Sequence, residues 1–163
     1  MLPVGRPRGR DTSVGPVMHA EATESLDGHS NAMCKSAKLT ARLDLPKAAA
    51  KGSFVAPAIF EIGSLSDLTQ ENFGPILHVI RWKSGALDEV VDQINASGFG
   101  LTLGLQSRID TVLERVEARA RVGNIYIHLN QIGAEVVRPP FGGEGLSGTG
   151  PQAGGPHDVA RAP

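Results

Sequence analysis

Ile76-Leu-His-Val-Ile-Arg-Trp82 begins the stretch of sequence that decides the fold. This compact apolar run is bounded by Gly74-Pro75 and by Lys83-Ser84-Gly85, a pattern that is typical of a buried strand. Two further short apolar runs, residues 101–105 and residues 123–128, follow along the chain and are also predicted to be strands.

Two amphipathic helices are predicted between these strands. The apolar positions of the first are Leu87, Val90, Val91 and Ile94, and those of the second are Ile109, Val112, Leu113, Val116 and Ala120. We expect Ser84 and Ser107 to cap the two helices, with Gly98 and Gly123 just past their ends. The order strand, helix, strand, helix, strand predicts right-handed crossovers and a parallel sheet with flanking helices, which is an α/β architecture.

The segments before this core carry weaker signals. Residues 1–13 hold proline, arginine and glycine without an apolar period, which predicts a loose N-terminal arm. A helix is plausible over residues 15–37, although Gly28 weakens it. Residues 53–62 look extended, and Pro57 favours an edge strand or an irregular one.

Length and charge exclude several classes of protein. The chain has 163 residues, enough for one domain with a real core. Its 16 basic and 17 acidic residues leave a net charge of -1, so nucleic-acid binding is not expected. No apolar run approaches the roughly 18 residues of a membrane helix, and no secretory signal is apparent. The single Cys34 cannot form an internal disulfide, and a cytoplasmic protein without a membrane segment is predicted.

From Gly133 onward, glycine and proline crowd the sequence. Because Phe141 and Leu146 give this segment something to pack on, we expect an ordered functional or interface loop and not a plain linker. Gly143-Glu-Gly-Leu-Ser-Gly148 formally matches the G-x-G-x-x-G dinucleotide fingerprint. A phosphate cradle is nevertheless not expected, because no strand runs directly into this stretch and no helical pattern follows it.

The histidines and the cysteine do not predict a metal site or a nucleophile. None of the five histidines, which are His19, His29, His78, His128 and His157, has metal-ligand spacing to another histidine, a cysteine or a carboxylate. His78 and His128 are therefore expected to be structural. Cys34 is interpreted as a bystander thiol, since no base has a reason to lie close to it.

Glu71 is the clearest candidate binding residue. It precedes Asn72-Phe-Gly-Pro75 and the predicted strand at residues 76–82. A carboxylate held at the edge of a sheet by this turn suits the two hydroxyl donors of a ribose. An ordinary turn with a solvated glutamate explains the same residues equally well.

These motifs resemble a known family. Thr69-Gln-Glu-Asn-Phe-Gly-Pro75 is similar to the E-x-F-G-P segment of NAD-dependent aldehyde dehydrogenases. The resemblance also rests on residues 14–22, 124–134, 140–151 and 153–156. The later stretches look like the C-terminal part of L-glutamate γ-semialdehyde (1-pyrroline-5-carboxylate) dehydrogenase. They are most similar to the variety fused to proline dehydrogenase in bacterial proline utilisation A proteins. The resemblance assigns residues 14–160 to a partial catalytic domain and leaves residues 161–163 as a tail.

The resemblance implies NAD as cofactor and a small aldehyde as substrate. It implies that Glu71 binds the hydroxyls of the nicotinamide ribose and that Phe73 lies close to the cofactor. Gly133 and Ala134 match a loop whose backbone N–H groups anchor the α-carboxylate of the substrate. Phe141 matches an aromatic residue that packs on the aliphatic chain of the substrate.

The resemblance also implies which residues this chain lacks. In the family a cysteine thiolate attacks the aldehyde, hydride passes to NAD, and a glutamate activates water to release the acid. Both residues precede the segment that residues 14–16 match, and Cys34 occupies a position without a catalytic role. Asn72 stands where the family usually has an aliphatic residue.

Two hypotheses follow. The chain is expected to be the C-terminal part of a dehydrogenase of proline degradation, without independent activity. The alternative is a non-catalytic α/β module that binds a protein partner, such as a dehydrogenase subunit, through its incomplete sheet.

Overall fold

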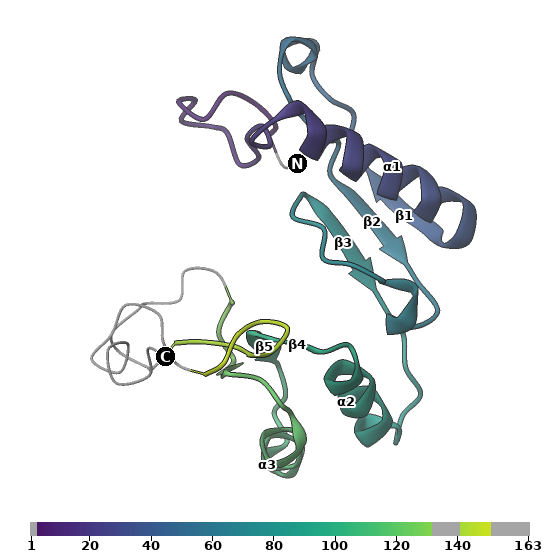
Figure 1. The fold of residues 1–163 in the computed structure, drawn as a ribbon, viewed down its shortest axis with the longest axis vertical. Helices are drawn as coiled ribbons and strands as arrows, with labels where there is room; N and C mark the ends of the chain where they lie inside the picture. The colour runs from purple at the N-terminus through teal and green to yellow at the C-terminus, as the bar shows by residue number, and fades with distance from the viewer. Residues whose placement is uncertain (1–2, 132–140, 151–163) are drawn as a thin grey trace. The chain divides into compact units, whose positions relative to one another are not determined.

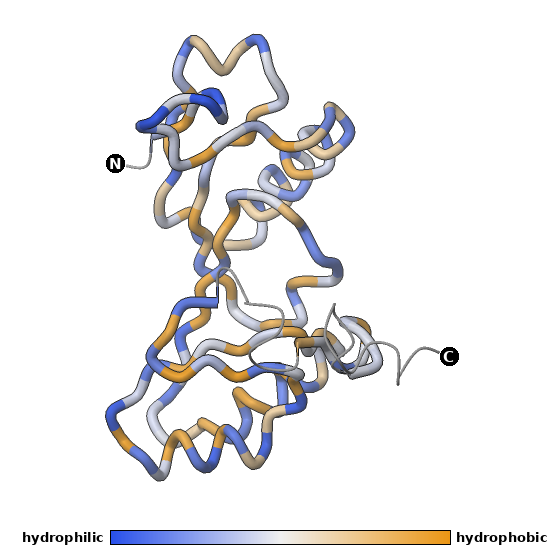
Figure 2. The backbone as a smooth tube through the Cα atoms, turned by 90° about the vertical axis from the view of Figure 1, so that its left-hand side faces the viewer, coloured by the Kyte–Doolittle hydropathy of each residue, from blue (hydrophilic) through white to orange (hydrophobic). Residues whose placement is uncertain are grey.

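A computed structural model describes residues 3–131 and 141–150 (Figure 1). The chain divides into two compact units, Met1–Arg81 and Trp82–Pro163, and each is described by itself below. Apolar residues occur in short stretches separated by hydrophilic ones along both units, in keeping with amphipathic elements (Figure 2).

The first unit is one helix on a three-stranded sheet. The elements are α1 (Ala20–Ser36), β1 (Lys38–Arg42), β2 (Ala58–Glu61) and β3 (Ile76–Val79), with short 3-10 turns η1 (Lys47–Lys51) and η2 (Leu65–Asp67). The strand order is β1-β2-β3, with β1 antiparallel to β2 and β2 parallel to β3. Figure 1 shows α1 lying along this sheet.

The core of the first unit lies between α1 and one face of the sheet. Ala58 and Phe60 are buried, whereas Ile59 and Glu61, which alternate with them along β2, are partly exposed, as the geometry of a strand requires. Phe60 has no exposed surface and packs in a cluster with Met33 of α1. Burial of this aromatic side chain fixes the helix on the central strand.

The helix predicted over residues 15–37 is confirmed with a later start. It begins at Ala20 because His19 serves as the N-cap, and the His19 Nδ1 accepts a hydrogen bond of 3.1 Å from the backbone N–H of Ala22. The N-terminal arm closes on itself, since the backbone N–H of Gly5 donates to the carbonyl of Val14 at 3.0 Å.

Two predictions for the first unit are corrected by the sheet. Pro57 does not mark an edge strand, because β2 is the central strand and Pro57 precedes it. Because Pro57 lies before the first paired residue of β2, the N–H that proline lacks is not missed from the ladder. The carbonyl of Pro57 accepts a 2.9 Å hydrogen bond from the N–H of Leu43. The run at residues 76–82 is not a buried strand, because β3 ends at Val79 and Leu77 is 56% exposed. Among the described residues, β3 is an edge strand of the sheet.

The second unit contains both predicted amphipathic helices. Its elements are α2 (Leu87–Ala96), β4 (Phe99–Gly100), β5 (Thr102–Leu105), α3 (Asp110–Arg119), β6 (Asn124–Ile127) and β7 (Glu144–Gly145). β5 and β6 are parallel and joined through α3, which confirms a strand–helix–strand crossover. β4 and β7 pair antiparallel.

The helix ends in the second unit are only partly as predicted. The N-cap of α2 is Ala86 and makes no side-chain bond, so Ser84 is not the cap. Ser107 does act at the start of α3, where its Oγ accepts a 3.2 Å bond from the N–H of Ile109. Gly98 follows α2 with a φ of 79°, as expected of a glycine past a helix end.

Two bidentate ion pairs join α2 to α3. Arg115 binds Asp88 at 2.6 and 2.7 Å, and Arg119 binds Asp92 at 2.8 and 2.5 Å. The hydrogen bonds from Arg115 and Arg119 lower the pKa values of Asp88 and Asp92, respectively. Because the two pairs have the same offset along the chain, the helices run in the same direction, as successive crossover helices do.

The α/β class is therefore confirmed, but the predicted single sheet is not. Among the described residues β3 pairs with β2, whereas β5 pairs with β6 in a different sheet. Hydrophobic periodicity identifies an element but not the edge that it pairs with, and Ala58 and Ile76 provide that edge for β3. None of the described helices is both long and apolar enough to cross a membrane.

Candidate functional site

Glu71 and Phe73 lie together at a hollow in the first unit. The hollow has a volume of about 460 Å³ and is lined by the chain leading into α1, by the first turns of α1, and by the loop of residues 69–75. The Glu71 side chain is exposed, and Phe73 is 79% exposed. The structure thus brings the two predicted cofactor-binding residues to one place.

Close packing holds the 69–75 loop against α1. A β-carbon on Gly74 would lie 2.5 Å from Cδ1 of Leu26, a side chain that is almost fully buried. A larger residue would fit here only if Leu26 or the loop moved, so glycine allows the closest approach of the loop to the helix. The carbonyl of Pro75 accepts a 3.1 Å bond from the N–H of Ala58, which fastens the loop to the start of β2.

A line of hydrogen bonds continues from the loop to the sheet. Gln70 and Asn72 bond each other, and Asn72 Nδ2 lies 3.5 Å from His29 Nδ1 on α1. His29 Nε2 is 2.9 Å from Nε2 of His78 on β3. His78 also stacks on Phe60, with ring centroids 6.4 Å apart.

This line explains the structural role predicted for His78 and adds two residues that the sequence did not single out. Burial lowers the pKa of His78, and the charge of His29 lowers it further. His29 is identifiable in hindsight, because it shares a helical face with Leu26 and Met33, which are buried. Asn72, noted only as a departure from the family pattern, is the link between them.

The Glu71 carboxylate is free to accept hydrogen bonds from a ligand. It forms no hydrogen bond or ion pair with any other described residue. An ionised carboxylate offers only acceptors, and a ribose offers two neighbouring hydroxyl donors. The donor and acceptor chemistry of this site therefore fits the sugar of a nucleotide cofactor.

The glycine-rich segment from Phe141 to Gly150 packs on backbone. Phe141 is partly buried, and β7 beyond it pairs with β4. A β-carbon on Gly123 would collide with the carbonyl oxygen of Gly142, so the two backbone segments are in direct contact. Within residues 141–150 this segment is an ordered strand and turn, as expected of an ordered loop.

Other sequence candidates lie apart from this hollow or outside the described residues. Gly133 and Ala134, the predicted anchor for the substrate carboxylate, are outside residues 3–131 and 141–150. Cys34 lies exposed on α1. His128 follows the last residue of β6 and has a φ of 58°. In the described part of the chain, no three histidine, cysteine or acidic side chains are grouped to hold a metal ion.

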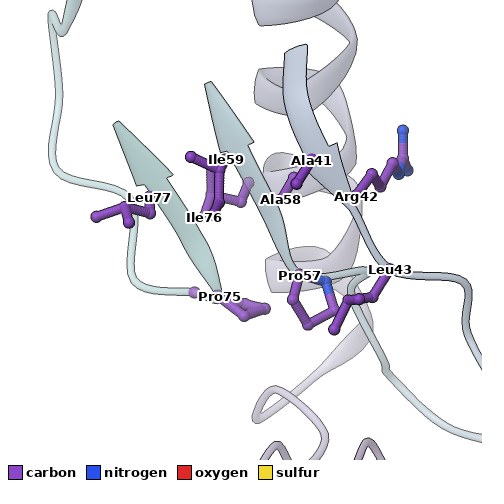
Figure 3. A pocket seen from close by; sticks show the side chains of 10 residues that line it. Ala41, Arg42, Leu43, Pro57, Ala58, Ile59, Pro75, Ile76 and Leu77 are labelled. Carbon is purple, nitrogen blue, oxygen red and sulfur yellow. The ribbon is translucent and has the colours of Figure 1, made fainter. Parts of the chain in front are cut away.

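A second hollow lies on the sheet of the first unit. It has a volume of about 600 Å³, and its walls are mainly aliphatic (Figure 3). Ile59 and Leu77 contribute from β2 and β3, on the face opposite Phe60 and His78, because side chains alternate along a strand. On this face Leu77 is 56% exposed.

The fold and the site define a class of protein. A family model described as "Aldehyde dehydrogenase family" matches residues 1–162. The chain therefore belongs to the aldehyde dehydrogenase family, and its α/β fold is that of part of such a domain.

Particular relatives narrow the class. The chain is 45% identical over 158 residues to the bifunctional protein PutA of Klebsiella aerogenes, covering 94% of this chain and 12% of that protein. It is 33% identical to the 1-pyrroline-5-carboxylate dehydrogenase of Bacillus subtilis, covering 95% of this chain and 30% of that enzyme. The chain thus spans only a small part of the relatives that it matches.

Solved structures agree. Proline utilization A of Bradyrhizobium japonicum superposes with a TM-score of 0.89 at 49% identity, covering 96% of this chain and 16% of that one. A 1-pyrroline-5-carboxylate dehydrogenase from Thermus, solved with bound NAD, gives a TM-score of 0.80 at 33% identity over 91% of this chain and 28% of that one. These similarities confirm the resemblance to the C-terminal part of 1-pyrroline-5-carboxylate dehydrogenase and proline utilisation A proteins.

Proposed function

We propose that this chain supplies part of the cofactor site and part of the substrate site of a cytoplasmic NAD-dependent L-glutamate γ-semialdehyde dehydrogenase. The observation that carries the proposal is the shared position of Glu71 and Phe73 at one hollow, in a chain of this family. The substrate is the semialdehyde formed in proline degradation, and the product is L-glutamate.

Glu71 is the residue that would hold the cofactor. Its free carboxylate accepts hydrogen bonds from the hydroxyls of the nicotinamide ribose, and the exposed ring of Phe73 lies beside the cofactor. When bound, NAD accepts the hydride that leaves the substrate. The protein's part in this step is to orient the sugar, and thereby the ring that it carries.

The substrate side of the proposal rests on Gly133, Ala134 and Phe141. The first two would anchor the α-carboxylate through backbone N–H groups, and Phe141 would pack on the aliphatic chain. The nucleophilic cysteine and the water-activating glutamate of the family have no counterpart in this chain. We therefore propose that the chain does not oxidise the aldehyde alone and acts together with further dehydrogenase residues.

A chimera tests this proposal. Residues 14–160 would replace the matching part of the Bacillus subtilis enzyme, and NADH formation from glutamate semialdehyde would be measured. We expect an active chimera in which Glu71→Gln raises KM for NAD by about 10- to 100-fold, since a hydrogen bond to a charged group contributes about 1.5–3 kcal/mol. Glu117→Gln, which changes an exposed glutamate of α3, is the matched control and should leave KM unchanged.

Two results would overturn the proposal. One is an active chimera in which Glu71→Gln and Glu117→Gln have the same effect. The other is NADH formation by the isolated chain above the blank, since that would show independent catalysis.

A second function is favoured by the uncovered aliphatic hollow on β2 and β3. A non-catalytic module would use this face and the outer edge of β3 to bind a dehydrogenase subunit. Replacing the exposed Leu77 by lysine would then abolish co-purification with that subunit. If the Leu77→Lys variant still co-purifies, this second function is refuted.

A further inference from the structure

We propose that His29 and His78 form a neutral hydrogen-bonded pair that positions the 69–75 loop through Asn72. They are positioning residues, because they act on Glu71 through the loop and do not touch the ligand. The importance of the loop rests on the proposed function, whereas the hydrogen-bond line does not.

The geometry requires unlike ring nitrogens to face each other. Nε2 of His29 and Nε2 of His78 are 2.9 Å apart, and the rings meet edge to face at 71°. A hydrogen bond of this length needs one N–H donor and one bare nitrogen acceptor. Only one of the two Nε2 atoms can therefore carry a proton.

The side-chain amide of Asn72 decides which nitrogen carries it. Its Oδ1 accepts from Gln70 Nε2 and its Nδ2 donates to the carbonyl of Gln70, both at 3.2 Å, so the amide has one orientation. The same Nδ2 lies 3.5 Å from Nδ1 of His29. Since an amide nitrogen only donates, Nδ1 of His29 is the acceptor.

The proton positions then follow along the whole line. A neutral His29 that accepts at Nδ1 carries its proton on Nε2 and donates it to His78. His78, which accepts at Nε2, carries its own proton on Nδ1. Each hydrogen bond thus has a fixed direction: Asn72 of the loop donates to His29 of α1, and His29 donates to His78 of β3.

The groups that contact the two rings from neighbouring elements are uncharged. α1 presents His29 to His78, β2 presents the uncharged ring of Phe60, and the loop presents the amide of Asn72. Among the described residues, no carboxylate bonds to either imidazole. Burial lowers the pKa of His78, and repulsion from His29 when that ring is charged lowers it further, which disfavours a doubly charged pair.

An added proton breaks one of the two hydrogen bonds that His29 makes. Protonation of His29 puts an N–H on Nδ1 facing the N–H of Asn72, and protonation of His78 puts one on Nε2 facing that of His29. Asn72 lies between Glu71 and Phe73 in sequence, so loss of its bond to His29 removes one tie between α1 and the backbone that carries both side chains. The position of the 69–75 loop therefore depends on the charge of two histidines outside the hollow.

Nitrogen NMR of the full chain, labelled with ¹⁵N, tests the proposal without NAD. Spectra of the imidazoles and backbone amides would be recorded from about pH 8 to about pH 5, across the ordinary histidine range. At the upper end we expect a single Nε2–H form of His29 and a single Nδ1–H form of His78. The amide signals of Asn72 and Phe73 should shift together with the titration of the pair.

His78→Gln should abolish the shared pH-dependent shift of the Asn72 and Phe73 amides. His128→Asn is the matched control: it removes an exposed imidazole, and asparagine tolerates the φ of 58° found there. This control should leave the shift unchanged.

The wild-type spectra alone can overturn the proposal. Nδ1 protonation of His29, or tautomer-averaged signals from either ring, would contradict the line of hydrogen bonds. Amides of Asn72 and Phe73 that ignore the titration would refute positioning. The predicted tautomers together with a failed Glu71→Gln test would refute the proposed function and leave the pair intact.

Discussion

Gly74 and Gly28 should respond in opposite directions to the same substitution, alanine. Gly74 is in the 69–75 loop, directly against Leu26 of α1, whereas Gly28 is within α1 and has open space around it. The free energy of unfolding should fall in Gly74→Ala and rise in Gly28→Ala.

The size of the Gly74 effect follows from the contact distances. A new β-carbon would lie 2.5 Å from Cδ1 and 2.8 Å from Cδ2 of Leu26. Carbon atoms in contact stay about 3.5–4.0 Å apart, so the loop or the leucine must move by about 1 Å. Leu26 is only 3% exposed, and overpacking of a buried site costs about 1–3 kcal/mol.

For Gly28 the expected gain is about 0.5–1 kcal/mol. Alanine removes the extra backbone freedom of glycine in a helix interior and meets nothing within 4 Å. Urea unfolding of the full chain, followed by far-ultraviolet circular dichroism, measures both free energies. The two variants differ by one methyl group each, so each is the control for the other.

A double-mutant cycle isolates the contact itself. In a Leu26→Ala background the new methyl group has room, and Gly74→Ala should cost little. The coupling energy between the two positions should therefore be about 1–3 kcal/mol. An equal cost of Gly74→Ala with and without Leu26 would refute the close packing of the loop on α1.

Three further predictions concern packing and charge. Phe60→Ala should destabilise the first unit by about 3–5 kcal/mol, because it empties the centre of the core; urea unfolding measures it, and a loss below about 1 kcal/mol would contradict that placement. Burial and the charge of His29 lower the pKa of His78 below its usual 6.5, so the unfolded chain binds more protons and stability should rise as pH increases through this region. This rise in stability with pH should be smaller in His78→Gln. An equal pH dependence of stability in the variant and the wild type would contradict the role of His78. Asp88→Asn should lower Tm at neutral pH, because the hydrogen bond from Arg115 lowers the pKa of Asp88. The difference in Tm from wild type should vanish as pH falls below the usual pKa of 3.8 and through the lower folded-state value. Thermal melts in which the two proteins differ equally at all pH values would exclude the ion pair as the cause.

The sequence predicts the elements of this fold better than their partners. Leu87 and Val91 are one helical turn apart, as are Val112 and Val116, and α2 and α3 form where these spacings predict them. Pairing depends on residues far apart in the chain, such as Ala58 opposite Ile76, and periodicity does not contain that information. The parallel pairing that the pattern predicts is found for β2 with β3 and for β5 with β6, but periodicity does not say which strands share a sheet.

The candidate site shows the same division. Glu71 and Phe73 were predicted from a short local motif, and the structure places both at one hollow. His29 is separated from its partner His78 by 49 positions in the sequence. A lone histidine in a helix carries no signal of such a contact, because its spacing to neighbours is unremarkable. Gly133 and Ala134 remain predictions.

The boundary between Arg81 and Trp82 has a practical consequence for protein production. All strand pairs described above join strands on the same side of this boundary: β1, β2 and β3 before it, and β4 to β7 after it. A cut there breaks no ladder, so two separately expressed pieces keep their own hydrogen bonds. Amide hydrogen exchange should accordingly report two cooperative units with different opening free energies, one around Phe60 and one around Val116.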